Sequence, residues 1–428
     1  MMMLTLSLVF GALLCMGLPI AFVLGITALA MVALYSPSPL VMVPEVMYNS
    51  LDTFPLMAIP FFVLAAQFMV RGGVTKHLIE AANCYVGHVR GGLAVVAVVA
   101  CMLFAAICGS SVATALAIGV IVIPAMMKYG YPRSFAAGTV AASGTMGIMI
   151  PPSIPLIIYG IIAEESIPRL FLAGFMPGLL EGGLYIAWIA YYSRRKGFGG
   201  DHPRASLAHT LSATWKAIPA YSLPFIILGG IYTGLVTVTE AAALAAVVSI
   251  FIGLFIYRGV CLREIIPVSV ESMKGAGMIM FIITSAIVFG NWLTEAGVPA
   301  RAVALATELK LSSFAFLLFI NIILLILGMF LEVASIMLIT LPIMLPIVHQ
   351  LGIDPIHFGI IVTVNMELAL ETPPVGLNLY VISGVAKAPL WEVIKGTFPF
   401  TCLGLIQLAI ITYWPGFSLF LPNLLMPR

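Results

Sequence analysis

The pattern of apolar positions predicts a bundle of membrane-crossing helices, because much of the chain consists of apolar runs near the length that spans a bilayer, about 20 residues. The clear runs are roughly Leu4–Leu34, Phe54–Val70, Leu170–Tyr192, Trp215–Ile231, Thr239–Tyr257, Met278–Leu293 and Thr397–Phe420. Two further runs, Ser134–Ala163 and Ile356–Val385, are each interrupted by a double proline. We therefore expect nine crossings, seven continuous and two broken.

The two broken runs carry the most functional information. Their central stretches are Ser143–Pro155 (SGTMGIMIPPSIP) and Asn365–Leu377 (NMELALETPPVGL). Proline removes a backbone donor and obstructs the preceding turn, and lipid cannot satisfy the carbonyls that are freed. Such breaks are tolerated where protein or a water-filled cavity surrounds them, and a matched pair of breaks is typical of the central site of secondary transporters.

Two other apolar stretches, Gly91–Met127 and Ser313–Val348, are too long for one helix and too short for two spans with a proper loop. Small or polar residues interrupt each near its centre, at Cys108–Thr114 (CGSSVAT) and Gly328–Ser335 (GMFLEVAS). We expect re-entrant hairpins, in which two half-length helices meet at a tip inside the membrane. The alternative is a pair of short tilted spans joined by a tight turn.

These features recur with an offset of 222 residues, which indicates an internal repeat. The offset relates Pro151 to Pro373, Pro124 to Pro346, Gly130 to Gly352 and Gly174 to Gly396. The predicted fold is therefore an all-α polytopic membrane protein, built as an inverted repeat with two re-entrant hairpins and two broken helices.

The repeat suggests a division of the chain into four parts. Residues 1–50 form an N-terminal anchor helix and a connector, and residues 193–277 form a linker with two scaffold helices. Repeat 1 (51–192) contains a scaffold helix, an amphipathic arm at Thr75–Gly87, hairpin 91–128, broken helix 134–163 and helix 170–192. Repeat 2 (278–428) contains a helix, an arm at Pro299–Leu309, hairpin 313–350, broken helix 356–385 and a terminal helix.

Composition supports a membrane protein and excludes several other classes. Of the 428 residues, 62% are hydrophobic and 8% are charged, against about 25% charged residues in soluble domains. A net charge of +2 gives no reason to expect a nucleic-acid partner. The six cysteines include no C-x-x-C pair, and no H-E-x-x-H, P-loop or G-x-S-x-G motif occurs, so we expect no enzyme, no catalytic residues and no bound organic cofactor.

The basic residues suggest how the chain is oriented. Positive charge stays on the cytoplasmic side, and the first arm and hairpin carry five basic residues: Arg71, Lys76, Arg90, Lys128 and Arg133. We therefore expect hairpin 1 to enter from the cytoplasm and hairpin 2 from outside. With this orientation only Arg169, Arg301, Lys310 and Arg428 lie on the outer side.

Oxygen-bearing residues at the tips and breaks are candidate ligands for a coupling sodium ion, because sodium prefers oxygen and these folds supply it from unwound backbone and half-helix ends. Glycine also lets the backbone turn its carbonyl groups inward. The sodium candidates are Ser110, Ser111, Ser143, Gly144, Thr145, Ser335, Asn365 and Gly376. The alternative for these small residues is close packing between helices.

An anionic substrate would need donors from the same region, because no Lys or Arg lies inside the predicted core spans. Helix N-termini supply positive dipole ends, and Thr114, Thr372 and Asn378 are candidate substrate contacts. Glu332, Glu367 and Glu371 lie in apolar runs, where a charge costs about 2.5–3.5 kcal/mol on insertion scales. Ion coordination and a proton relay are both open for these acids, and a helix-start position is the alternative for Glu332. Glu240 is expected to be a first-turn acid of the helix that follows it.

At these motifs the chain resembles the large membrane (M) subunit of tripartite ATP-independent periplasmic (TRAP) transporters. The resemblance rests on stretches between residue 50 and the C-terminus: Ser50–Met69, Gly109–Pro124 (GSSVATALAIGVIVIP), Gly147–Gly160 (GIMIPPSIPLIIYG), Gly230–Ala243 (GIYTGLVTVTEAAA) and Glu371–Val381 (ETPPVGLNLYV). The first tip is similar to dicarboxylate-type members. The second tip, Leu331–Ser335 (LEVAS), departs from the acidic residue followed by Pro-Thr-Pro that many members carry.

The resemblance implies an elevator mechanism in the ion-transporter superfamily, with hairpins and broken helices sliding past a static scaffold. It implies sodium-coupled uptake of a small organic acid, such as a C4-dicarboxylate, across the bacterial inner membrane. It also implies two partners, a small four-helix membrane (Q) subunit and a periplasmic substrate-binding (P) protein. Two alternatives are a stand-alone anion/sodium symporter of the same superfamily, and a membrane scaffold or enzyme subunit without ion-dependent transport.

Overall fold

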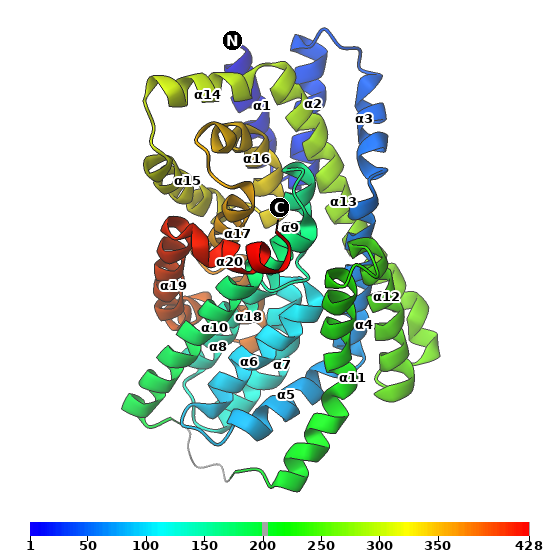
Figure 1. Cartoon of the computed structure of the whole chain (residues 1–428), viewed down its shortest axis with the longest axis vertical. Helices are drawn as coiled ribbons and strands as arrows, with labels where there is room; N and C mark the ends of the chain where they lie inside the picture. The colour runs from blue at the N-terminus through cyan, green and yellow to red at the C-terminus, as the bar shows by residue number, and fades with distance from the viewer. Residues whose placement is uncertain (199–203, 428) are drawn as a thin grey trace.

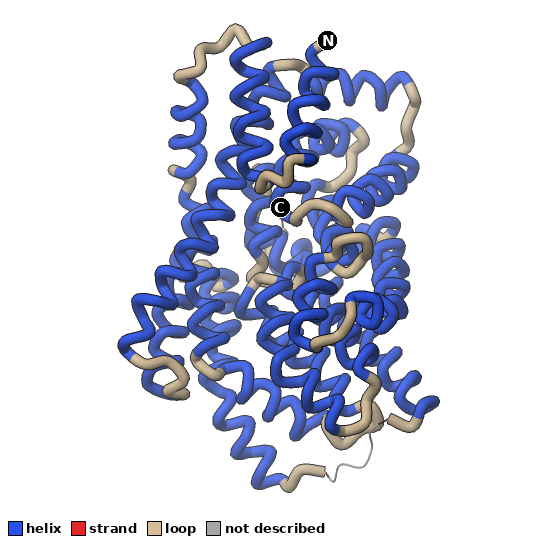
Figure 2. Tube along the Cα trace, turned by 180° about the vertical axis from the view of Figure 1, so that it is seen from behind, coloured by secondary structure: helices blue, strands red, loops and turns tan. Residues whose placement is uncertain are grey.

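The computed structural model describes residues 1–198 and 204–427, and every regular element within these ranges is helical. Figures 1 and 2 show an elongated bundle in which the helices differ widely in length and direction. Within the described ranges, seven helices are long and apolar enough to cross a membrane. The predicted all-α, polytopic architecture is therefore confirmed.

The N-terminal part differs from the single span expected over Leu4–Leu34. It forms α1 (Met2–Cys15) and α2 (Ile20–Tyr35), which are followed by α3 (Met42–Leu51). The chain turns between α1 and α2 because Gly17 has a left-handed φ of +74° and Pro19 lacks a backbone donor. A continuous apolar run therefore contains a helix break.

The first half of the remaining chain contains the elements expected of repeat 1. In order, these are η1 (Phe54–Met57), α4 (Ala58–Arg71), α5 (Val74–Val86), α6 (Gly92–Cys108), α7 (Ser111–Lys128), α8 (Arg133–Thr145), η2 (Met146–Ile148), α9 (Ile154–Ile162) and α10 (Ile167–Lys196). The predicted first hairpin is the pair α6 and α7, and the predicted first broken helix is the pair α8 and α9.

Two helices follow, α11 (Leu207–Tyr232) and α12 (Val238–Phe251), the latter extended by η3 (Ile252–Ile256). Glu240 closes a capping box at the start of α12: its carboxylate accepts from the backbone of Thr237 at 2.8 Å, and the Thr237 hydroxyl accepts from the backbone of Glu240 at 3.3 Å. The prediction of a first-turn acid is confirmed.

The second half contains the same order of elements. After η4 (Leu262–Glu264) these are α13 (Ile265–Glu295), α14 (Val298–Glu308), α15 (Ser313–Gly328), α16 (Val333–Gln350), α17 (Pro355–Leu370), α18 (Leu377–Ala386), α19 (Leu390–Tyr413) and α20 (Pro415–Leu425). The offset of 222 residues carries the start of α7 onto that of α16 and the start of α8 onto that of α17. The terminal span expected over Thr397–Phe420 is divided at Trp414, which leaves the helical conformation (φ −126°, ψ +78°) because proline follows it.

The helices form two groups. One continuous apolar core joins the hairpins and broken helices to their neighbours, and α2, α3, α4, α12 and α13 lie together on one side of the molecule (Figure 1). Packing of α4 against α12 and of α2 against α13 holds the second group together. At the edge of this group, Arg71 at the end of α4 forms an ion pair with Glu271 of α13.

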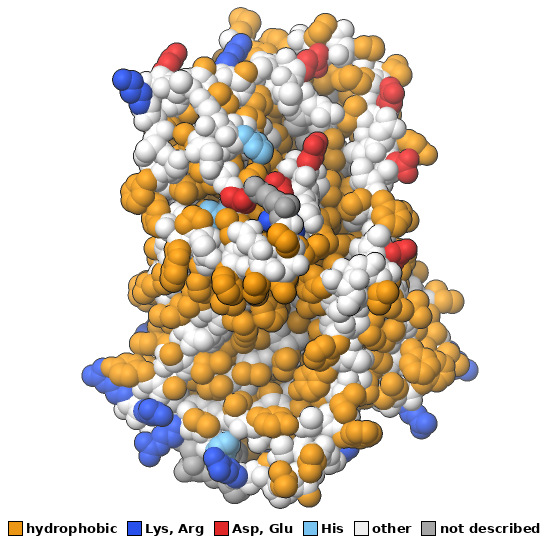
Figure 3. Space-filling model, in the orientation of Figure 1, with side chains coloured by type: hydrophobic (Ala, Val, Ile, Leu, Met, Phe, Trp, Pro, Cys, Tyr) orange, Lys and Arg blue, Asp and Glu red, His pale blue; other side chains and the backbone are white. Residues whose placement is uncertain are grey.

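Charge is unevenly distributed over the long axis. Figure 3 shows Lys and Arg side chains gathered at the end where α5 and the last turns of α10 lie, with most of the visible acids in the opposite half. A broad belt of hydrophobic side chains separates these regions. By the positive-inside rule, the basic end is the one predicted to face the cytoplasm, and this orientation stays a prediction.

Candidate functional site

The tip of the first helical hairpin lies directly against the first double-proline loop. Gly109 ends α6 with a left-handed φ of +63°, and Ser110 is extended before α7 begins. A Cβ at Gly109 would lie 2.6 Å from the carbonyl oxygen of Pro152, and the Ile154 amide donates to the Gly109 carbonyl at 3.4 Å. Glycine at this position therefore permits the tip and the loop to touch through their backbones.

The second tip repeats this arrangement at the other double proline. The turn between α15 and α16 runs from Met329 to Glu332, and the Val375 amide donates to the Met329 carbonyl at 3.2 Å. Gly376, with φ of +54°, follows and directly precedes α18. Each half thus brings one hairpin tip and one broken helix into backbone contact.

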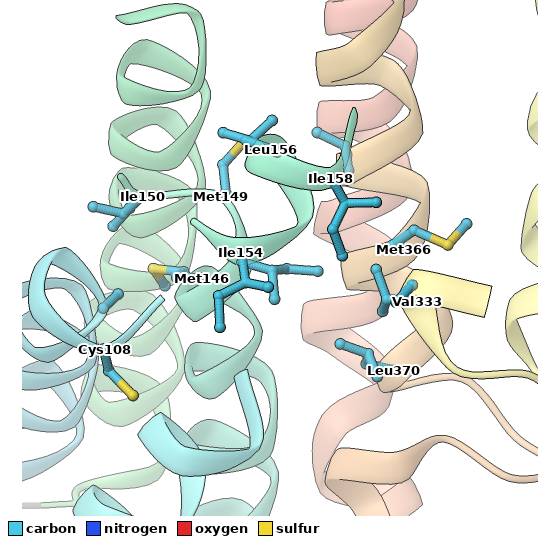
Figure 4. Close-up of a cluster of buried hydrophobic side chains, with 14 of the residues drawn as sticks. Cys108, Met146, Met149, Ile150, Ile154, Leu156, Ile158, Val333, Met366 and Leu370 are labelled. Atoms are coloured by element: carbon cyan, nitrogen blue, oxygen red, sulfur yellow. The ribbon is translucent and has the colours of Figure 1, made fainter. Parts of the chain in front are cut away.

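A cavity that is open to solvent lies between the two tips. It joins residues from both hairpins and both broken helices, together with Ile279 of α13. Its lining residues are Gly109, Ser110, Ser111, Val112, Ile148, Ile154, Pro155, Ile158, Ile279, Glu332, Val333, Ala334, Leu370 and Leu377. Figure 4 shows Ile154 and Ile158 from the first half facing Val333 and Leu370 from the second half.

The cavity combines apolar walls with two helix N-termini. The first residues of α7 (Ser111 and Val112) and of α16 (Val333 and Ala334) line it. Free backbone N–H groups and the helix dipole make such ends favourable for anions. Glu332 is the only charged residue among those described in the lining, so the anion-binding potential comes from backbone rather than from Lys or Arg.

Several buried oxygens near the tips have no hydrogen-bond partner. The Ser143 and Ser335 hydroxyls and the Asn365 carbonyl oxygen are fully buried without one. The Asn365 amide nitrogen is held by Asn321 at 2.7 Å and by the Ile361 carbonyl, which leaves its oxygen free to accept. Ser143 and Asn365 are related by the 222-residue offset. A buried acceptor without a donor suits a cation, because the cation replaces the missing partner.

The other predicted sodium ligands lie in different settings. Ser110 and Ser111 are at the tip and line the cavity. Gly144 faces α7, where an added Cβ would lie 2.5 Å from the Cβ of Ala115. Gly376 directly precedes α18 at the second break. Thr145 donates to the Ala142 carbonyl at 2.6 Å and lines a separate cavity described below.

The predicted substrate contacts do not line the cavity between the tips. The Thr114 and Thr372 hydroxyls donate to backbone carbonyls one turn earlier, of Ser110 and Leu368. Asn378 is fully buried and hydrogen-bonded to Ser111. In this conformation, the side chains of all three are engaged within the protein.

The acids singled out in the sequence separate into two places. Glu332 is exposed and lines the cavity between the tips, directly before α16. Glu367 and Glu371 are 3% and 2% exposed and line a second, narrow cavity together with Glu181 of α10, and Thr145, Tyr185 and Gln407 also line it. The charged residues lining this narrow cavity within the described chain are all acidic. Among the described residues, no group of three or more His, Cys, Asp or Glu side chains is arranged to hold a metal ion.

Sequence reasoning missed three polar residues of this region. Glu181 and Asn321 occur inside apolar helices, and an isolated acid or amide at membrane depth is the signal that could have identified them. Gln407 of α19 is 1% exposed and donates to the Pro177 carbonyl at 3.2 Å. Its role becomes visible only when α19 is placed beside α10.

Comparison with a solved structure supports the overall fold. The structure titled "Crystal structure of the Alcanivorax borkumensis YdaH transporter reveals an unusual topology" superposes with a TM-score of 0.64 over 88% of both chains. Sequence identity to that protein is 14%, so the similarity concerns the fold alone.

Two curated relatives and a family model are much closer in sequence. The chain is 48% identical over 400 residues to the C4-dicarboxylate TRAP transporter large permease protein DctM of Pseudomonas aeruginosa, covering 94% of this chain and 93% of that one. It is 42% identical over 411 residues to the isethionate TRAP transporter permease protein DctMQ of Oleidesulfovibrio alaskensis, covering 96% of this chain and 65% of that one. The model of the tripartite ATP-independent periplasmic transporter DctM component matches residues 7–417. The chain therefore belongs to the DctM family, the large permease components of TRAP transporters.

Proposed function

We propose that this permease carries out sodium-coupled uptake of a small organic anion, a C4-dicarboxylate or a related acid, across the bacterial inner membrane. The observation that carries the proposal is the cavity between the two hairpin tips, into which two helix N-termini project. A carboxylate bound there would accept hydrogen bonds from the first turns of α7 and α16.

Sodium supplies the positive charge that the cavity lacks. With Glu332 as the charged residue of its described lining, the cavity by itself attracts a dianion only weakly. Sodium ions at the unpartnered oxygens of Ser143 in one half, and of Ser335 and Asn365 in the other, would offset the substrate charge close to the tips. Ions and anion then favour one another's binding, which is the thermodynamic basis of coupling.

An elevator movement is compatible with how the cavity is built. Its lining comes from hairpins and broken helices, with Ile279 as the contribution of the long helix α13. Each hairpin packs closely on a broken helix, α7 against α8 and α15 against α17, so in this proposal they would move as one body with the cavity inside it. In this proposal the group around α2, α4, α12 and α13 is the static scaffold.

The substrate and the partners are inferred from the family. The two relatives are named for a C4-dicarboxylate and for isethionate, both small organic acids. A tripartite system supplies a small membrane subunit and a periplasmic binding protein as partners. Support for the membrane partner comes from the name DctMQ of the longer relative, of whose length this chain covers 65%.

The proposal is tested by uptake of radiolabelled C4-dicarboxylates and related acids into proteoliposomes that contain this chain and its small membrane partner. Four conditions are compared, with and without an inward sodium gradient and with and without the cognate binding protein. Uptake that requires both supports the proposal. Uptake that needs sodium alone favours the stand-alone symporter, and uptake indifferent to sodium refutes the coupling.

A further inference from the structure

Asn378 connects the two halves of the molecule at the first hairpin tip. It is the second residue of α18 and is fully buried. Its side-chain oxygen accepts from the Ser111 hydroxyl at 2.9 Å, and its amide nitrogen donates to the Ala141 carbonyl at 3.2 Å. One amide from the second half thus holds both the start of α7 and the middle of α8 from the first half.

The packing of α18 explains how this residue reaches the other half. α18 lies against α7 and α8, whereas α9, its counterpart in the first half, lies against α16 and α17. The 222-residue offset relates Asn378 to Leu156, which is also fully buried but apolar. Leu156 therefore cannot give the second tip the side-chain hydrogen bonds that Asn378 gives the first.

Both atoms held by Asn378 lie on segments close to Ser143, which is the residue proposed to bind sodium in the first half. Ser111 begins the helix that follows the tip, and Ala141 precedes Ser143 by two residues on α8. Asn378 also follows Gly376 by two residues, and Gly376 is a predicted sodium ligand of the second half. A shift of α18 at the second break would therefore move the amide that spaces α7 from α8.

We propose that Asn378 is a positioning residue, which sets sodium affinity by fixing the distance between the first hairpin tip and α8. This inference rests on the proposed sodium coupling. It assigns Asn378 a role different from the substrate contact expected from the sequence, because both functional groups of its amide are directed at protein atoms.

The test measures sodium-dependent uptake in proteoliposomes for the wild-type complex, Asn378→Leu and the smaller Asn378→Ala. The matched control is Thr139→Val, a buried α8 residue whose hydroxyl donates to the Phe135 carbonyl within its own helix. Loss of two buried hydrogen bonds predicts about a tenfold rise in the sodium concentration for half-maximal uptake. The substrate KM at saturating sodium should stay near the wild-type value, and Thr139→Val should resemble wild type.

Three results would overturn the inference while leaving sodium coupling intact. A raised substrate KM with unchanged sodium dependence would make Asn378 a substrate ligand. A lower maximal rate with both constants unchanged would indicate a structural role, and wild-type behaviour of both variants would indicate none. Absence of sodium dependence in the wild type would instead refute the proposed function itself. Size-exclusion profiles and thermal midpoints identify any variant that has not folded, and Asn378→Ala serves if Asn378→Leu fails.

A double-mutant cycle gives a second measure. If Asn378 acts through the Ser111 hydroxyl, Ser111→Ala should have a smaller effect on sodium affinity in the Asn378→Ala background than in the wild type. Strict additivity of the two changes would contradict the proposed linkage.

Discussion

The contact between the first hairpin tip and the first double-proline loop predicts a specific defect for Gly109→Ala. An alanine there keeps a left-handed backbone conformation, which costs about 1–2 kcal/mol. Its Cβ would also lie 2.6 Å from the Pro152 carbonyl oxygen, a distance that forces the tip and the loop apart. Because both segments contribute backbone to the proposed site, we expect loss of both stability and transport.

The control for this prediction is Gly130→Ala. Gly130, two residues after α7 ends, has φ of +79°, and an added Cβ would meet nothing within 4 Å. This variant therefore pays the conformational cost without the clash. Any further effect of Gly109→Ala reports the close approach itself, and a penalty of about 1.4 kcal/mol in the transport-competent state corresponds to a tenfold change.

The assay combines thermal unfolding of the purified protein with sodium-driven uptake in proteoliposomes. We expect Gly130→Ala to lower the thermal midpoint slightly and to transport normally. Gly109→Ala should unfold at a lower temperature than Gly130→Ala and should transport at least about tenfold more slowly. Equal stability and equal uptake for the two variants would refute the argument that a backbone contact shapes the tip.

Three other predictions concern the remaining polar contacts. Asn365→Leu removes an unpartnered buried oxygen, so sodium-dependent uptake should be lost while expression in the membrane stays normal; normal uptake would exclude Asn365 from the site. Glu367→Gln should raise the thermal midpoint, because a neutral amide of the same shape is easier to bury among acids than a carboxylate. As a control, the same substitution at the exposed Glu308 should leave the midpoint unchanged. A lower midpoint for Glu367→Gln would contradict this view. Arg133 and Glu392 are paired at 2.8 Å and are both over one-third exposed, so alanine substitutions of the two should be nearly additive in a double-mutant cycle on thermal stability. A strong coupling would show that the pair is more than a surface ion pair.

The sequence alone predicted those parts of the fold that depend on glycine, proline and small polar residues, which interrupt helices locally. Proline pairs at Pro151 and Pro373 mark the broken helices because proline disrupts a helix wherever it occurs. The small residues Gly109 and Ser110 mark the first tip, since a long apolar run has few other points at which to turn. The break at Gly17–Pro19 has the same glycine and proline signal. It lies inside a long apolar run, and Leu4–Leu34 was therefore expected to be a single span.

What the sequence could not predict are contacts between distant elements. Glu367 was recognised as unusual, yet its closeness to Glu181 depends on α10 and α17 packing together. Asn378 was recognised as a polar residue near a break, but its partners Ser111 and Ala141 are more than 200 residues away. These contacts form because helices of one half pack against helices of the other. Local sequence patterns do not show which residues then face each other.

The crossed packing of α9 and α18 also has a consequence for biogenesis. During synthesis, hairpin 1 and α8 enter the membrane long before residue 378 leaves the ribosome, so the partner of the Ser111 hydroxyl is not yet present. Until α18 is inserted, the first half is therefore incompletely packed, and its polar groups are exposed to lipid or to insertion factors. A chain truncated before α18 would lack the helix that closes this region, which makes late truncations natural targets for membrane quality-control proteases.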